Sequence, residues 1–286
     1  MQALPVLSLL FAATFWGTVW YPLRLLADAG IAGLWQALIS YLVATLVVLP
    51  VYWSRRAELR GRVPGLVPLA LAAGWCNVGF MLGMLEGTVL RVLLLFYLAP
   101  VWAVLLARVV LGERLAPRTW VALPMALAGV TLMLYDATLG LPLPMDRADW
   151  LGLTAGLAFA ITTVETRRLQ AVSVTAKTLA SWVGVMLVAT LGLGLGGHAF
   201  PDAPAAAWAG TVALGCSGFL AATLAVQFGA THLPVQRTTV ILLLEIVVGA
   251  VSSAWLAAEY TETRDWLGGM LIVGAGLAAA KADEVR

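Results

Sequence analysis

Long apolar runs alternate with short polar segments along the whole chain. A helix needs about 20 apolar residues to cross a bilayer, and most of these runs reach that length. None shows the strand-like alternation with turn residues that is typical of an outer-membrane barrel, so the pattern predicts an all-α integral membrane protein. Ten spans are predicted, roughly Leu4–Leu26, Leu34–Tyr52, Val63–Leu85, Val89–Ala107, Thr119–Tyr135, Trp150–Thr166, Thr178–Gly197, Ala205–Ala230, Val235–Ala257 and Trp266–Ala280.

Composition identifies lipid as the solvent. Of the 286 residues, 62% are hydrophobic and 11% are charged, whereas a soluble domain carries about a quarter charged residues. The net charge of +2 does not indicate a nucleic-acid partner. Cys76 and Cys216 lie in apolar runs and are interpreted as small core residues, not as a disulfide or metal ligands. No metal or cofactor is expected.

The basic residues orient the spans. With the N-terminus in the cytoplasm, 13 of the 17 Lys and Arg residues fall on the cytoplasmic side, as the positive-inside rule requires. The sequence therefore predicts a multi-pass protein of a bacterial-type inner (plasma) membrane, with both termini cytoplasmic. No basic segment precedes Leu4, so the first run is expected to be a retained helix and not a cleaved signal.

The second half of the chain echoes the first. A shift of 146 residues places Arg91 on Arg237 and Trp120 on Trp266, and chance matches between apolar helices are the alternative explanation. We interpret the matches as a repeat, with one five-helix unit over residues 1–140 and a second over residues 141–286. Because five is odd, the two units enter the membrane in opposite directions, which is the inverted-repeat architecture of many secondary transporters.

One segment resembles a known family. "LAPVWAVLLARVVLGERL" closes the fourth span with a proline, small and apolar residues, and then Leu-Gly-Glu-Arg at Leu111–Arg114. Together with the ten spans, this motif resembles the EamA-type branch of the drug/metabolite transporter (DMT) superfamily, and the many tryptophans resemble the YddG aromatic amino-acid exporters. The second half departs from the motif, because Ile246 stands where the family often has Pro. The resemblance implies a central cavity formed by the first, third, fourth, sixth, eighth and ninth spans.

The candidate site residues are aromatic or polar side chains inside the spans. Tyr97 precedes Pro100, whose ring is expected to kink the fourth span, either as a hinge for alternating access or as a packing bend. Packing within or between helices is the alternative role for the aromatic and amide side chains. The substrate path is expected to be lined by Trp16, Trp20, Trp75, Asn77, Tyr97, Gln227 and Glu245.

Glu245 is the strongest of these candidates. It lies near the middle of the ninth span, on a stripe with Thr238, Gly249 and Ser252. A carboxylate at the bilayer centre costs at least about 2.5–3.5 kcal/mol unless it is solvated or paired, and so it usually marks a path for ions or substrate. We expect Glu245 either to bind a substrate ammonium group or to carry a coupled proton. A neutral acid that is hydrogen-bonded to a neighbouring helix is the structural alternative.

These features predict a secondary-active exporter. "GLGLGG" at Gly192–Gly197 lacks the Lys of a P-loop, so ATP hydrolysis is not expected. The predicted substrates are amino acids, above all aromatic and apolar ones, and related small metabolites, which the carrier would move by alternating access. A multidrug exporter of aromatic cations with the same fold is the alternative. A membrane enzyme is disfavoured because the chain has only two His residues, far apart in sequence.

Overall fold

The computed structural model describes residues 3–54, 63–112, 119–134, 144–233, 241–259 and 262–280, and all regular structure within these ranges is helical. The elements are α1 Ala3–Thr18, α2 Trp20–Asp28, α3 Gly33–Ser54, α4 Val63–Glu86, α5 Val89–Phe96, α6 Ala99–Val110, α7 Thr119–Leu134, α8 Arg147–Arg168, α9 Val174–Leu195, α10 Ala205–Ala213, the π-helix η2 Leu214–Phe219, α11 Leu220–His232, α13 Leu244–Leu256 and α14 Thr263–Ala280.

Six helical stretches of the described chain are long and apolar enough to cross a membrane, and α13 is a shorter apolar helix. This confirms a multi-span, all-helical membrane protein, while the count of ten stays a prediction. The α8 helix carries charged residues near both ends. The six stretches are Ala3–Asp28, Gly33–Tyr52, Val63–Glu86, Val89–Val110, Val174–Leu195 and Ala205–Gly229.

Several of these stretches are interrupted. The α1–α2 stretch bends at Val19, the α5–α6 stretch breaks at Tyr97 and Leu98, and a π-helix lies between α10 and α11. At the second of these breaks the Leu98 amide donates to Leu95 (3.3 Å), which is a tighter turn than an α-helix makes. Pro100 follows at the start of α6, where its missing amide proton is tolerated. The predicted interruption of the fourth span is therefore present, and its role as a hinge stays a prediction.

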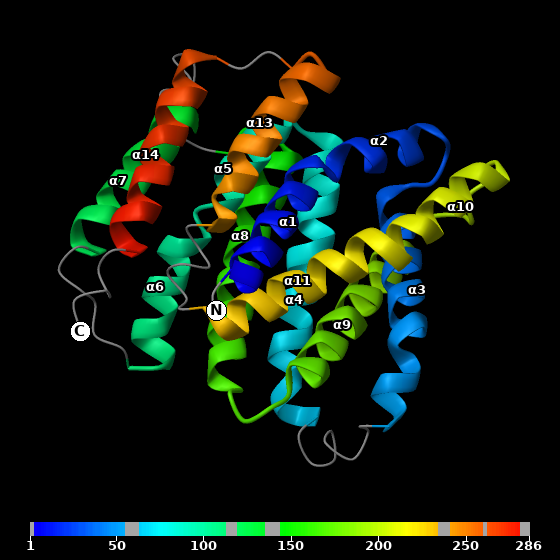
Figure 1. Cartoon of the computed structure of the whole chain (residues 1–286). Coiled ribbons are helices and arrows are strands. Elements are labelled where there is room, and N and C mark those ends of the chain that lie inside the picture. The colour runs from blue at the N-terminus through cyan, green and yellow to red at the C-terminus, as the bar shows by residue number, and fades with distance from the viewer. Residues whose placement is uncertain are drawn as a thin grey trace.

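The helices pack as two bundles and two side pairs (Figure 1). We call the first the α8 bundle, in which α8 packs against α4, α5 and α6, and the second the α1 bundle, in which α1 packs against α11 and α13. The side pairs are α7 with α14, at one edge of the molecule, and α3 with α9. The α2 helix continues α1 and is counted with the α1 bundle. The bundles meet where α13 contacts α5 and where α2 contacts α4.

This packing has the symmetry of a repeat. The shift that relates the halves pairs α1 with α8, α4 with α11, and the α5–α6 stretch with α13. The contacts of α1 with α11 and α13 then correspond to the contacts of α8 with α4 and with α5 and α6. Each bundle thus takes the first helix of its set from the opposite half of the chain, so the two halves cannot separate as independent units.

Candidate functional site

Glu245 lies in the first turn of α13, directly after an interruption at Leu243. The amide of Ile246 donates to the carbonyl of Leu243 (3.1 Å), whereas a regular α-helix would direct it to Leu242. The Leu242 carbonyl is thereby available to another donor. Leu243 is the residue that the 146-residue shift places on Tyr97. The predicted ninth span is therefore interrupted at Leu243, which the repeat shift makes equivalent to Tyr97 at the break between α5 and α6.

Tyr97 joins the two interruptions. Its hydroxyl lies 2.7 Å from the Leu242 carbonyl oxygen and 2.7 Å from Oε2 of Glu245. Both side chains are buried, with 6% of Tyr97 and 5% of Glu245 exposed. Tyr97 belongs to the α8 bundle and Glu245 to the α1 bundle, so this contact crosses between them. Two predicted site residues from opposite halves are thus brought into direct contact.

Small side chains allow this close approach. A Cβ atom on Gly17 of α1 would lie 2.8 Å from the Glu245 carbonyl oxygen, and one on Gly249 would overlap Leu93 of α5. One turn further on, the Ser252 hydroxyl donates to the Gly17 carbonyl at 3.0 Å. Glu245, Gly249 and Ser252 therefore form the contact face of α13, as their spacing predicts. Thr238, the fourth member of that stripe, lies outside the described residues.

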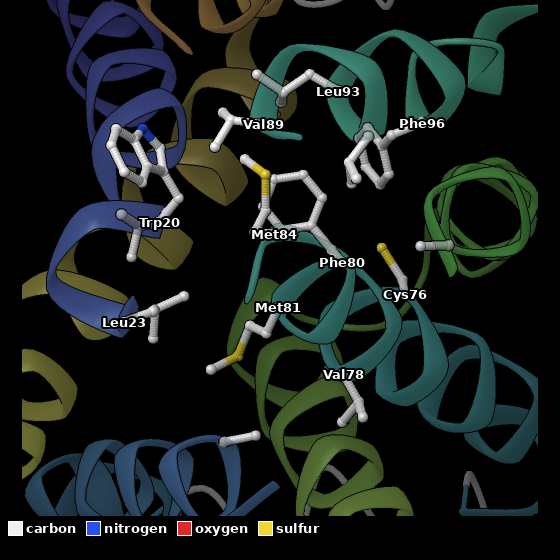
Figure 2. Close-up of a cluster of buried hydrophobic side chains, with 14 of the residues drawn as sticks. Trp20, Leu23, Cys76, Val78, Phe80, Met81, Met84, Val89, Leu93 and Phe96 are labelled. Carbon is white, nitrogen blue, oxygen red and sulfur yellow. The ribbon is translucent and has the colours of Figure 1, made fainter. Parts of the chain in front are cut away.

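An aromatic cluster adjoins this contact through Phe96, whose ring centroid lies 5.5 Å from that of Tyr97. Ring contacts run from Phe159 of α8 through Phe96 of α5 to Phe80 of α4, and from there to Trp16 of α1 at 6.0 Å between ring centroids. Trp16 in turn contacts Phe219 of η2 at 5.5 Å. Figure 2 shows Phe80 and Phe96 side by side in this core. Five helices from both bundles and both halves thus contribute to one aromatic cluster.

Trp20 is buried and joins two helices. Its ring is 1% exposed, and its indole N–H donates to Ser252 Oγ at 2.9 Å. This hydrogen bond joins α2 to α13 within the α1 side of the structure. Trp20 therefore holds helices together, in addition to any contact with substrate.

The remaining predicted residues lie on α4 and α11. Asn77 is partly buried on α4, where its Oδ1 accepts a hydrogen bond from Tyr41 at 2.6 Å. Gln227 is partly buried on α11. Trp75 is 41% exposed and donates to Thr154 of α8 at 3.2 Å. Tyr97 and Glu245 are two of the seven that contact each other directly through polar atoms.

A second polar centre, which the sequence did not predict, lies around Arg24 of α2. Its guanidinium pairs with Glu259, which follows α13, at 2.7 Å. The same guanidinium donates to the carbonyls of Met84 (3.1 Å) and Gly87 (2.6 Å) at the end of α4. Glu259 also accepts the amide of Val89, the first residue of α5, at 2.9 Å. We call this set the Arg24–Glu259 network; it joins the two bundles at the predicted outer side.

The acidic and basic residues nearby pair between helices. Arg91 forms a two-pronged ion pair with Asp149 of α8, at 2.6 and 2.8 Å. Glu86 pairs with Arg147 at 3.4 Å. Both pairs lie within the α8 bundle, because the start of α8 packs next to the α4–α5 connection. Helix packing, and not spacing along one segment, selects these partners.

The chemical groups at the site are few. Within the described part of the chain, no group of three His, Cys, Asp or Glu side chains is placed to hold a metal ion. Cys76 and Cys216 are free thiols. The site consists of the buried carboxyl of Glu245, the hydroxyl of Tyr97 and the backbone carbonyl of Leu242, which accepts no hydrogen bond from its own helix. The three groups lie where two interrupted helices meet. Such crossings of interrupted helices are where secondary transporters hold substrates and ions.

This architecture defines the class as a membrane transport protein with internally repeated helices. Comparison with known sequences is more specific: the EamA-like transporter family matches residues 3–135 and, a second time, residues 146–279. The chain belongs to this family, within the DMT superfamily. A solved structure titled "Crystal structure of protein" shares the fold, with a TM-score of 0.68 and 18% identity, over 100% of this chain and 99% of that one. No curated protein matches the chain.

Proposed function

We propose that the protein is a secondary-active exporter of amino acids, above all aromatic and apolar ones, and of related small metabolites. The observation that carries this proposal is the aromatic cluster between the two bundles, which adjoins one buried carboxyl. Aromatic walls bind apolar and aromatic side chains, and a carboxylate complements an ammonium group. The family establishes transport; the substrate class is the inference from these residues.

The proposed mechanism is alternating access by motion of the α1 bundle against the α8 bundle. The contacts that cross between them in the described structure include the Arg24–Glu259 network, the Tyr97–Glu245 contact and the Trp16–Phe80 contact. At the opposite end, Leu9, Ala13 and Leu233 form a separate cluster confined to α1 and the α11–α13 region. This distribution supports an outer-closed conformation, in which the outer ends of the bundles are joined.

The proposed topology has ten spans, both termini in the cytoplasm and a bacterial-type inner membrane. It takes α1 with α2, α5 with α6, and α10 with η2 and α11 as single crossings, beside α3, α4, α7, α8, α9, α13 and α14. The two matches to one family, one in each half, support the repeat. The inverted orientation of the halves follows from an odd number of spans in each.

The test is uptake into proteoliposomes that contain the purified protein. A panel of labelled amino acids and labelled aromatic cations is offered, with empty liposomes as the control. Saturable uptake of aromatic or apolar amino acids is the expected result. Uptake of aromatic cations without any amino acid would support the multidrug alternative, because an acid in an aromatic cluster also suits a cation. Phe96→Ala should weaken uptake through a higher half-saturation concentration.

A further inference from the structure

We propose that Glu245 is the site of a transported proton, bound when the outer side is closed and held there by Tyr97 and the free carbonyl of Leu242. The inference rests on the proposed transport function and names the coupling ion. It begins from the two oxygen atoms that lie 2.7 Å from the Tyr97 hydroxyl, one on Leu242 and one on Glu245.

A tyrosine hydroxyl has one proton to donate. The Leu242 carbonyl only accepts, and an ionised carboxylate also only accepts. If Glu245 were ionised, Tyr97 would satisfy one of these oxygens and hold the other at 2.7 Å without a proton between them. A protonated Glu245 resolves this conflict, because the carboxyl donates to Tyr97 and Tyr97 donates to Leu242. The geometry is therefore that of a protonated acid.

No cation from the described part of the chain replaces that proton. The helices packed against this part of α13 are α1 and α5. The α1 segment has no ionisable side chain. Among the described residues, Tyr97, which directly follows α5, contacts Glu245, and the Cys76 thiol of α4 lies within electrostatic reach of it; neither group is cationic. An ionised Glu245 at this depth would lack a counter-ion among the described residues, which is costly inside a membrane.

The site is also coupled to the conformation. The Leu242 carbonyl is free because the helix is interrupted there, and Tyr97 lies at the equivalent interruption of the opposite half. Loss of the proton to water would leave Tyr97 with two competing acceptors. Its bond to either Leu242 or Glu245 must then break, and both bonds join the α1 bundle to the α8 bundle. Proton release would thus loosen the contact in the middle of the two bundles.

Infrared difference spectroscopy tests the proton without any transported substrate. In the reconstituted protein we expect a C=O stretch of a protonated carboxyl that disappears as the pH is raised. It should be missing from Glu245→Gln and shifted in Tyr97→Phe. Glu165→Gln is the matched control, since Glu165 is a buried glutamate (7% exposed) paired with Arg168 at the end of α8. Tyr52→Phe is the control for Tyr97→Phe, because Tyr52 is a buried tyrosine outside the site.

Transport then tests the coupling. Wild-type protein should accumulate substrate in response to a pH gradient, and Glu245→Gln, which resembles the protonated acid, should lose that response to a much larger extent than it loses exchange at equal pH. A wild-type protein that transports without any pH-gradient response and shows no such infrared band would overturn the proposal and leave the exporter function standing. If Glu245→Gln lost exchange and accumulation equally, and the wild-type protein showed no such infrared band, Glu245 would be assigned to the substrate ammonium instead of the proton. A Glu245-dependent band without transport of any tested solute would overturn the exporter function instead.

Discussion

Arg24→Lys should open the outer side of the protein. The arginine fork contacts Glu259, the Met84 carbonyl and the Gly87 carbonyl at once. A lysine keeps the positive charge and can keep the ion pair, but it cannot reproduce the planar fork. The substitution therefore weakens the contacts of residue 24 with the Met84 and Gly87 carbonyls, which belong to the α8 bundle. The ion pair with Glu259 lies within the α1 bundle and is retained.

The size of the effect follows from the lost hydrogen bonds. A hydrogen bond to a charged group contributes about 1.5–3 kcal/mol, and the Arg24 side chain is 25% exposed, which favours the lower end. If lysine keeps one of the two carbonyl contacts, the outer-closed state loses roughly 1.5–2 kcal/mol, or about 10- to 30-fold in the equilibrium constant. An outer-open population of about 1% would then rise to roughly 10–20%.

Spin labels measure that population. We would place them at Asp28, at the end of α2, and at Met145, just before α8, since both positions are exposed. Cys216 is replaced and the buried Cys76 is kept. Double electron–electron resonance should show a longer-distance component in Arg24→Lys.

The matched control is Arg147→Lys, because Arg147 pairs with Glu86 on the same side but inside the α8 bundle. Identical distance distributions in wild-type protein and Arg24→Lys would refute the assignment of this network to outer closure, as would an equal change in the control.

Three further substitutions test the packing, all by thermal unfolding in detergent. Asp149→Asn should cost about 3 kcal/mol, because it breaks a buried ion pair with Arg91; an unchanged midpoint would show that the pair is dispensable. Gly184→Ala should cost about 1–3 kcal/mol, since its Cβ would overlap the backbone of α4, whereas Gly194→Ala on the same helix meets no atom within 4 Å and should be neutral. Ser252→Ala should cost about 1–2 kcal/mol by leaving a buried indole N–H unpaired; equal midpoints would contradict this.

Hydropathy predicted the class correctly because burial in lipid imposes one requirement on every span. Apolar runs must be helical, since lipid offers the backbone no other hydrogen-bond partner. The same pattern cannot say which helices touch. That Glu86 pairs with Arg147 depends on where α8 begins relative to α4, and this is set by packing between distant segments.

The two helix interruptions differ in how visible they are in the sequence. Pro100 marks the break between α5 and α6, because proline lacks the amide proton that a helix interior needs. At the equivalent place in the second half stands Ile246, which carries no such mark. Beside the turn at Leu243, the Tyr97 hydroxyl from the other half of the chain donates a hydrogen bond to the Leu242 carbonyl. Repeat alignment is the one sequence feature that indicates it, since Leu243 aligns with Tyr97.

The asymmetry of the site has a consequence for stoichiometry. The repeat shift places Glu245 on Ala99, and Tyr97 on Leu243, so the crossing of the two interrupted helices carries one carboxyl and one hydroxyl instead of two of each. If Glu245 is the proton site, each cycle exchanges at most one proton. Exchange of one proton for one zwitterionic amino acid moves one net charge, and such transport must respond to membrane potential as well as to pH. Accumulation driven by a pH gradient but indifferent to an imposed potassium diffusion potential would contradict a one-proton exchange for a zwitterion.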